Sequence, residues 1–276
     1  MKTLIDTYLL SNGVALPKIG FGTWQVDSGQ ICYDAVTEAL RVGYRHIDTA
    51  AAYRNEKSVA MAIRDSKIPR ESIFVTSKLQ SHIKTYEGTL EAFEKTMNEL
   101  GFDYLDLYLI HAPWPWNEMG KDCKEGNVQA YKAMEKLYKE GRVRAIGVSN
   151  FNVEDLKNIL DHCDIVPHVN QIAFFIGNNQ AETHRFCQEK NILVEAYSPL
   201  AIGYALSNPQ IIKMAEKYQV TPAQICIRYC IEKETAPLPK SVTPSRISEN
   251  ANVDFKMDQA DIDYLDSIQE DPRRWS

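Results

Sequence analysis

Four side chains that can transfer or stabilise a proton stand beside short apolar runs of the chain. Asp48, Lys78 and His111 lie at the ends of three successive apolar runs, and Tyr53 follows Asp48 by five residues. Charged groups have no reason to end apolar segments unless they pair or react. If these ends meet at one place, the four residues form a set that donates a proton to an oxygen atom.

Each member of this set has a defined part in proton donation. A free tyrosine has a pKa of about 10 and is a poor acid at neutral pH, but an adjacent ammonium such as Lys78 lowers that pKa. A buried lysine needs a carboxylate partner, which Asp48 can supply. His111 can donate a hydrogen bond to a carbonyl oxygen and orient it. No Ser-His-Asp set, catalytic cysteine pattern or metal-binding spacing accompanies the four residues, so they lack a nucleophile or hydride.

Taken singly, three of these residues have simpler structural explanations. Asp48 could cap the following helix, Lys78 could extend to solvent, and His111 could be a hydrogen-bonded core histidine. These explanations weaken when an acid, a lysine and a histidine end three consecutive runs that face one opening.

The apolar runs alternate with amphipathic stretches along the whole chain, which indicates strands and helices in turn. Several runs are almost continuously apolar, as in parallel strands buried on both faces. Helical periodicity marks 88–100, 128–140 and 180–190, and Thr221-Pro222 is typical of a helix start. The expected strands are 19–23, 46–49, 73–78, 105–111, 143–149, 169–172, 193–198 and 236–240.

Eight strand-helix units predict an α/β fold, a single (β/α)8 TIM barrel, rather than an open sheet. The chain has 276 residues, near the ~250 typical of such barrels. We therefore expect one domain over residues 1–276, with an N-terminal β-hairpin turning at Asn12-Gly13 and an extra C-terminal helix. The long connections 112–127 and 199–208 are expected to be functional, because active sites of these barrels lie at the carboxyl ends of the strands.

Composition limits the possible partners. The 31 Lys and Arg against 37 Asp and Glu give a net charge of −6, so a general basic surface for nucleic acid or anionic lipid is not expected. The six cysteines form no Cys-x-x-Cys pair and are expected to be reduced, with no metal site. The N-terminal apolar stretch is broken at Asp6 and is too short for a signal peptide, and no run reaches membrane-spanning length. We expect a cytoplasmic monomer.

Two short patterns resemble motifs of other nucleotide-binding enzymes. Gly20-Phe21-Gly22 begins like a dinucleotide fingerprint, but Gln25 stands where the third glycine belongs. Tyr53 and Lys57 have the Tyr-x-x-x-Lys spacing of short-chain dehydrogenases, yet no glycine-rich turn follows the first strand. Lys57 is therefore expected to be an exposed helix residue.

Longer motifs resemble one known family. The stretch GYRHIDTAAAYRNE at 43–56 is similar to the signature of the aldo-keto reductases, and further matches are LIH at 109–111, IGVSNF at 146–151 and YSPL at 197–200. The resemblance implies the barrel fold, a nicotinamide cofactor bound without a Rossmann fold, and reduction of aldehydes or ketones to alcohols. By position, Asp48, Tyr53, Lys78 and His111 match the catalytic tetrad, with Tyr53 as proton donor.

The resemblance also places a cofactor site. Tyr197 offers a flat face for a nicotinamide ring, and Ser149, Asn150 and Gln171 are suited to its carboxamide. Lys240, Ser241 and Arg246 could hold a 2′-phosphate, which favours NADPH, with NADH bound more weakly; alternatively, the two cations are ordinary solvated surface charge. The cofactor-binding residues expected are Thr23, Trp24, Asp48, Ser149, Asn150, Gln171, Tyr197, Ser198, Leu200, Lys240, Ser241, Val242, Thr243, Arg246, Glu249 and Asn250.

The substrate pocket departs from the commoner family pattern. Leu79 and Ala112 stand where large aromatic residues are frequent, and 173–176 replaces a common Glu-x-His-Pro run. The mouth is therefore expected to be wide. Little chain follows the last expected helix, only 270–276, which resembles bacterial members of the family; this resemblance implies small dicarbonyls, or sugar-derived or aromatic carbonyls, as substrates. The residues expected to contact substrate are Trp24, Tyr53, His111, Trp114 and Phe174, with Trp116 as a further apolar wall.

An alternative function is a nicotinamide-binding sensory or regulatory subunit with little turnover. Both functions would bind the cofactor, and the complete tetrad favours the enzyme.

Overall fold

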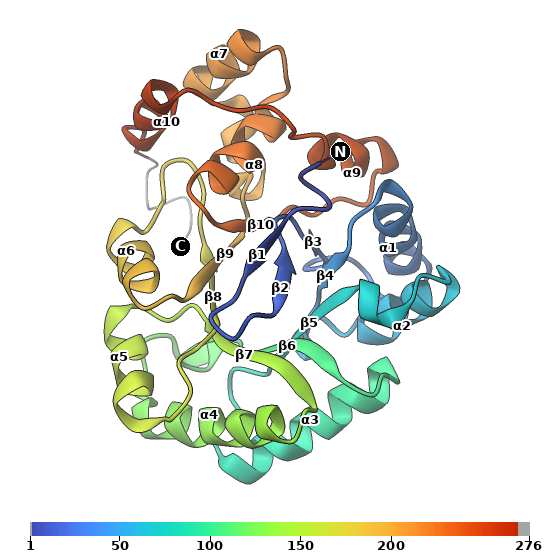
Figure 1. Cartoon of the computed structure of the whole chain (residues 1–276), viewed down its shortest axis with the longest axis vertical. Coiled ribbons are helices and arrows are strands. Elements are labelled where there is room, and N and C mark those ends of the chain that lie inside the picture. Colours follow the sequence, from blue (N-terminus) through green and yellow to red (C-terminus); the bar gives the residue numbers. More distant parts are fainter. Residues whose placement is uncertain (1, 270–276) are drawn as a thin grey trace.

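Eight parallel strands form the centre of the computed structural model, which describes residues 2–269 (Figure 1). Neighbouring strands follow the order of the chain, so each connection leads to the next strand of the sheet. The strands are β3 (Phe21–Gly22), β4 (His46–Asp48), β5 (Phe74–Leu79), β6 (Leu105–Ile110), β7 (Val143–Ser149), β8 (Val169–Ala173), β9 (Leu193–Tyr197) and β10 (Ala236–Leu238). Every expected apolar run overlaps one of these strands.

Backbone hydrogen bonds join the first and last strands and so close the sheet. The amides of Gly20 and Gly22 donate to the carbonyls of Pro237 and Pro239, at 3.0 and 3.1 Å. A Cβ at Gly20 would lie 2.5 Å from Leu238 Cδ2 and 2.6 Å from the Nδ1 of the buried His46 ring, so a larger residue there would displace side chains packed at the closure. The two glycines thus serve barrel closure, and the expected (β/α)8 fold is confirmed.

Helices surround the barrel in the order expected of strand-helix units (Figure 1). They are α1 (Gln30–Val42), α2 (Glu56–Asp65), α3 (Tyr86–Leu100), α4 (Lys124–Lys139), α5 (Val153–His162), α6 (Ala181–Glu189), α7 (Pro209–Tyr218), α8 (Pro222–Glu232), α9 (Pro244–Ala251) and α10 (Gln259–Asp266). The Thr221 side chain accepts from the Gln224 amide and Gln224 reaches back to the Thr221 amide, which caps α8 as the sequence predicts. The extra C-terminal helix is α10, which packs on α7.

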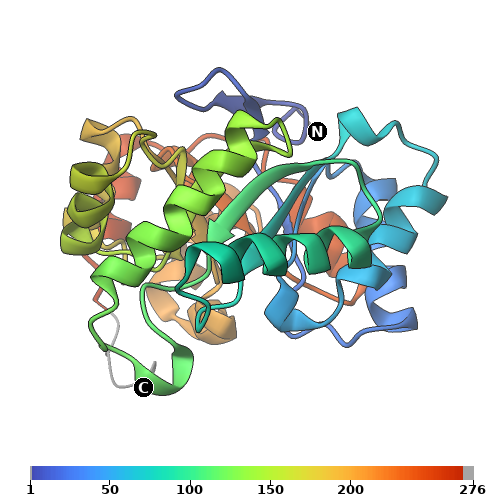
Figure 2. The same ribbon diagram turned by 90° about the horizontal axis from the view of Figure 1, so that it is seen from below.

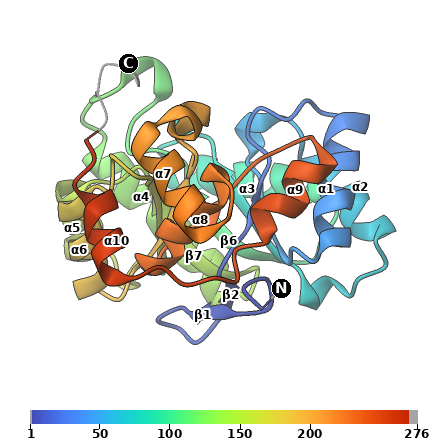
Figure 3. The ribbon, with the colours of Figure 1, turned by 90° about the horizontal axis from the view of Figure 1, so that it is seen from above.

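The N-terminal hairpin covers the amino-terminal end of the barrel (Figures 2 and 3). It pairs β1 (Thr7–Leu9) with β2 (Ala15–Pro17), and its Leu10 and Leu16 pack in one buried cluster with Leu107 and Leu109 of β6. Within the turn only Gly13 has a positive φ, of 82°, so the turn is not the type I′ form that Asn12-Gly13 favours. Because the hairpin covers this end, a ligand must enter at the opposite end.

Several element boundaries differ from the sequence expectations, most of them by one or two residues. β3 and β10 are shorter than the runs that contain them, because their ends turn into loops. α4 begins at Lys124, so the long connection after β6 is 111–123, and a short 3-10 turn, Ala201–Ser207, occupies most of the second long connection. The tail expected at 270–276 lies outside the described residues. Within 2–269 no helix is long and apolar enough to cross a membrane.

Candidate active site

A cavity of about 770 Å³ opens at the carboxyl ends of the strands. It brings Asp48, Tyr53 and His111 together with residues from the ends of β7, β8, β9 and β10. Its lining consists of Gly22, Trp24, Gln25, Asp48, Ala52, Tyr53, His111, Trp116, Ser149, Asn150, Gln171, Ala173, Asn178, Tyr197, Ser198, Pro199, Leu200, Ile202, Gly203, Leu238, Pro239 and Lys240.

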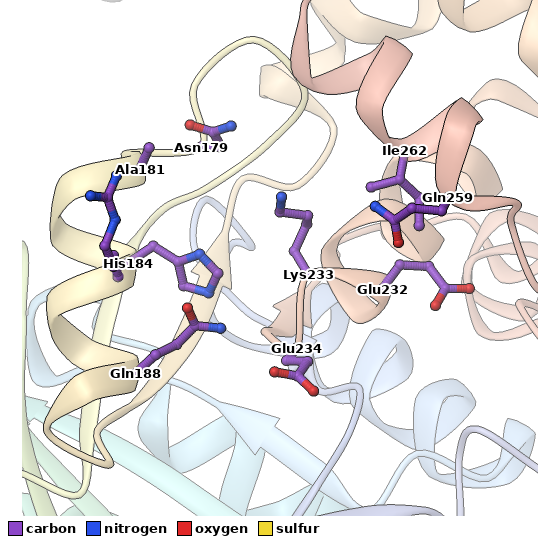
Figure 4. Close-up of a pocket in the computed structure, with 10 residues that line it drawn as sticks. Asn179, Ala181, His184, Gln188, Glu232, Lys233, Glu234, Gln259 and Ile262 are labelled. Carbon is purple, nitrogen blue, oxygen red and sulfur yellow. The ribbon is translucent and has the colours of Figure 1, made fainter.

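A second, smaller cavity of about 330 Å³ lies between α6 and the elements α8 and α10 (Figure 4). His184 and Gln188 of α6 face Lys233 and Glu232 across it. Two of its charged residues are paired within the protein: Lys233 with Asp266 at 2.7 Å, and Glu232 with Arg228 at 2.8 Å. The larger cavity, which contains the proton-transfer residues, is therefore the candidate active site.

Asp48 and Lys78 form a buried ion pair at the floor of this cavity. Lys78 Nζ donates to both Asp48 carboxylate oxygens at 2.7 Å and to the Thr49 carbonyl at 2.9 Å. Lys78 is fully buried, and burial acts to lower its pKa; Asp48 and Tyr53 outweigh that effect, so the pKa is raised and the ammonium is kept. The structure thus provides the carboxylate partner that the sequence predicts.

Tyr53 meets Lys78 from the short 3-10 turn after β4. Lys78 Nζ lies 3.4 Å from Tyr53 Oη. Burial raises the pKa of Tyr53, and the nearby ammonium lowers it by less. The expectation that Lys78 depresses this pKa therefore holds for the direction of the lysine's effect but is wrong for the net shift, because removal from water has the larger effect.

Asn55 positions the turn that carries Tyr53. Its side-chain amide donates to the carbonyls of Thr23 and Val26, at 2.9 and 3.0 Å, and its oxygen accepts from Thr49 Oγ1 at 2.8 Å. Thr23 Oγ1 in turn donates to the Asp48 carbonyl at 2.9 Å. Thr23, expected to bind cofactor, is buried and ties the ends of β3 and β4 together.

His111 stands beside Tyr53 as a neutral ring. Burial and the charge of Lys78 lower the pKa of His111 to about 3. Its ring meets Tyr53 edge-on at 5.5 Å between centroids, and its Nδ1 finds no partner within 2–269. A neutral imidazole at this place can donate one hydrogen bond to an oxygen in the cavity.

Three expected carboxamide-binding residues and Tyr197 form one hydrogen-bonded group. Tyr197 Oη donates to Asn150 Oδ1 at 2.7 Å, which fixes the ring against the cavity wall. Both amide hydrogens of Asn150 are used, by the His111 carbonyl at 3.0 Å and by Ser149 Oγ at 3.1 Å. Asn150 has a φ of 64°, a conformation that asparagine tolerates better than most residues. Asn150 therefore orients Tyr197 and the end of β6.

Gln171 connects the ion pair to a carboxyl group that the sequence reasoning missed. Gln171 Nε2 donates to Asp48 Oδ2 and to Glu195 Oε2, both at 2.8 Å. Glu195 is fully buried, and burial, with a smaller contribution from Asp48, raises its pKa. Its Oε1 lies 3.6 Å from His46 Nε2. A charged residue inside the apolar run 193–198 was the available signal.

Of the cofactor residues expected after β10, only Lys240 lines the cavity. Ser198, Leu200 and Lys240 line the cavity, while Ser241 to Asn250 lie beyond its wall. Lys240 and Arg246 are exposed, and neither has an ion-pair partner within 2–269. Val242 and Thr243 are also exposed, before α9 begins.

The last two expected cofactor residues belong to α9. Asn250 is buried. Glu249 Oε1 accepts a hydrogen bond from Thr221 Oγ1 at 2.9 Å, so this carboxylate is tied to the start of α8.

The expected aromatic wall is placed only in part. Trp24 and Trp116 line the cavity, and Trp114 packs on Trp116 at 5.0 Å between centroids without lining it. The expectation that Phe174 contacts substrate is wrong: its ring is fully buried between His184 and Tyr229, with ring centroids 5.1 and 6.2 Å away. The reason is that the chain turns outward at the end of β8, which directs Phe174 into the helix layer and leaves Ala173 at the cavity.

Within the described part of the chain, no group of three or more His, Cys, Asp or Glu side chains could hold a metal ion. The six cysteines, all described, form no disulfide.

Comparisons with known proteins agree with this geometry. A model of the Aldo/keto reductase family matches residues 18–270. The chain is 42% identical over 272 residues to glyoxal reductase of Bacillus subtilis, covering 98% of this chain and 95% of that protein. It is 41% identical to 9,11-endoperoxide prostaglandin H2 reductase of Trypanosoma cruzi, covering 96% and 92%.

Solved structures show the same fold. An aldo/keto reductase from Brucella melitensis superposes with a TM-score of 0.90 at 40% identity, covering 96% of this chain and 98% of that one. An aldo-keto reductase from a Medee basin deep-sea metagenome library gives 0.89 at 44% identity, covering 95% of each.

Proposed function

The chain belongs to the aldo/keto reductase family of nicotinamide-dependent, carbonyl-reducing oxidoreductases, and we propose that it reduces aldehydes and ketones with NADPH. Tyr53 donates the proton. The observation that carries this proposal is the contact at 3.4 Å between Tyr53 Oη and the buried Lys78 ammonium, beside the neutral ring of His111.

The donor groups of the cavity fit a nicotinamide. Tyr197 is held by Asn150 with its ring at the wall, a surface on which a flat heterocycle can stack. Both hydrogens of the Gln171 amide go to Asp48 and Glu195, which leaves its carbonyl oxygen to accept from a carboxamide. These contacts support a nicotinamide at this end of the cavity, and when bound it supplies a hydride for the carbonyl carbon.

The protein's own groups serve the carbonyl oxygen. His111 donates a hydrogen bond that orients the oxygen and stabilises the negative charge that develops on it. The Tyr53 hydroxyl then gives its proton to that oxygen, and the resulting phenolate lies next to the Lys78 ammonium. Asp48 keeps Lys78 charged, so that this stabilisation is in place before the proton moves.

NADPH is proposed over NADH because of the cations after β10. Lys240 and Arg246 are exposed and have no acidic partner within 2–269, so they are free to pair with a phosphate. A 2′-phosphate would gain from both charges, whereas the hydroxyl of NADH would not.

The cavity wall favours a partly apolar carbonyl substrate. Trp24 and Trp116 give it flat apolar surfaces, and Ala173 leaves room between them and β8. We propose small dicarbonyls, sugar-derived carbonyls and aromatic aldehydes as the substrate class.

The test is Tyr53→Phe, assayed with a panel of methylglyoxal, phenylglyoxal, sugar aldehydes and diketo acids with each cofactor. Loss of the proton donor should lower kcat by about a hundredfold or more, while the Kd for NADPH stays close to that of the parent protein. Tyr264→Phe, on the exposed face of α10, is the matched control and should leave kcat unchanged. Full activity in Tyr53→Phe would refute the role of Tyr53. Binding of NADPH by the parent protein with no turnover of any substrate would instead favour the regulatory function.

A further inference from the structure

The segment between β6 and α4, residues 111–123, carries the aromatic wall of the candidate site. It is the green loop at the end of the barrel opposite the hairpin (Figures 2 and 3). Trp116 lines the cavity from this segment, and its ring meets His111 edge-on at 5.7 Å between centroids. A shift of the segment would therefore change the space beside His111 and Tyr53.

Two side chains from outside the segment hold its start against the first turn of α4. Lys84 Nζ, from the loop between β5 and α3, donates to the Ala112 carbonyl and to Asn127 Oδ1, both at 2.7 Å. Asn127 Nδ2, from the first turn of α4, donates to the Pro113 carbonyl at 2.9 Å. Asn127 is only 2% exposed, so these bonds are shielded from water.

The Lys84 ammonium loses favourable contact with water at this place. Within 2–269 its ammonium hydrogen-bonds only to neutral oxygens, and burial lowers its pKa to about 8, with Cys123 and Asp155 opposing the shift. A neutral amine would still have hydrogens for both acceptors, so the bonds do not depend on the charge.

The backbone of α4 also packs closely against Lys84. A Cβ at Gly126 would lie 2.7 Å from Lys84 Cβ and 3.0 Å from the Lys84 carbonyl. Only a glycine there lets α4 pack this closely on Lys84. A further anchor for the segment is Ser81 Oγ, which accepts from the Trp116 amide at 3.3 Å.

We propose that Lys84 and Asn127 form a latch that positions Trp116 and thereby determines which carbonyl substrates bind. Both are positioning residues, since neither lines the cavity. The inference about substrates rests on the proposed carbonyl reduction, but the latch itself is a property of the segment and can be measured without turnover.

The experiment compares Lys84→Met with Lys95→Met, an exposed lysine on α3 that serves as control. Hydrogen–deuterium exchange of 114–121 should be faster by about fivefold or more in Lys84→Met, and unchanged in Lys95→Met. KM for phenylglyoxal should rise by about fivefold or more, whereas kcat and the Kd for NADPH should change by less than about twofold.

Variants of Asn127 test the latch independently, in case Lys84→Met does not fold. Asn127→Asp keeps the acceptor for Lys84 but loses the donor to the Pro113 carbonyl, so its exchange rate should lie between those of the parent protein and Asn127→Ala. Unchanged exchange in Lys84→Met and Asn127→Ala would overturn the latch, as would a KM for phenylglyoxal unaffected by faster exchange. If the parent protein turns over no carbonyl, the proposed function fails, and the exchange rates still decide whether the latch exists.

Discussion

Replacing Lys78 by methionine should destabilise the protein through the carboxylate that it leaves behind. Asp48 is 3% exposed and receives two hydrogen bonds from Lys78 Nζ at 2.7 Å. In Lys78→Met its remaining side-chain donor among the described residues would be Gln171. Methionine fills much of the space of the lysine stem, so the change isolates the loss of the ammonium.

The expected loss of unfolding free energy is about 3–5 kcal/mol, as for other buried ion pairs that lose one partner. Most of this cost is the uncompensated charge, so Asp48→Asn combined with Lys78→Met should cost less than the sum of the single variants, by about 1–3 kcal/mol. Simple loss of packing would instead make the two effects additive.

The assay is urea denaturation followed by circular dichroism near neutral pH, for the parent protein, both single variants and the double variant. Lys136→Met provides the control, because Lys136 pairs with Glu140 on the exposed face of α4 and such pairs contribute little. A loss below about 1 kcal/mol in Lys78→Met, or additive effects in the double variant, would refute the reasoning.

Four further changes test other parts of the structure. Burial raises the pKa of Glu195 from an ordinary 4.5 to about 8, so this group stabilises the fold at low pH and loses that effect as the pH rises through 8. Glu195→Gln should therefore reduce the fall in unfolding free energy between about pH 5.5 and about pH 8.5. An unchanged fall would contradict the shift. Gly20→Ala would place a Cβ 2.6 Å from His46 Nδ1 and should cost about 1–3 kcal/mol in urea unfolding, at the closure of the barrel. Phe174→Ala should cost about 3–5 kcal/mol with KM unchanged, and a raised KM would return Phe174 to the substrate wall. Arg246→Ala should weaken NADPH binding by about tenfold or more while the Kd for NADH barely changes; equal losses in titrations of both cofactors would remove the 2′-phosphate argument.

The tetrad was accessible to sequence reasoning because its signal is local. Asp48 ends β4, Lys78 is the penultimate residue of β5, and His111 follows β6. Parallel strands in a barrel bring their carboxyl ends to one opening. Their residue types limit the chemistry to proton transfer and charge stabilisation, whatever the distances between them.

Glu195 and Lys84 were not accessible in this way. Glu195 faces Gln171 because β8 and β9 pair in that register, and an apolar run with one acid does not reveal the register. Lys84 meets Ala112 and Asn127 across separations of 28 and 43 residues. A lysine in a polar loop has no local feature that distinguishes it from a solvated one.

Phe174 and Trp116 show the same limit for apolar residues. Both are aromatic residues in connections that follow strands, and their surroundings in the chain do not tell which one points inward. The outward turn after β8 buries Phe174 beneath α6, and the anchored segment after β6 brings Trp116 to the cavity.

The sequence by itself determined the barrel, the end at which chemistry occurs and the residue types of the tetrad. Those conclusions depend on periodicity and on residue types at strand ends, which are local properties of a chain. The tertiary structure decided the balance of burial and charge at Tyr53, the link from Gln171 to Glu195, and the set of aromatic residues that form the wall. These features depend on contacts between residues far apart in sequence, where a difference of a few ångströms decides whether two groups pair, and periodicity does not encode such distances.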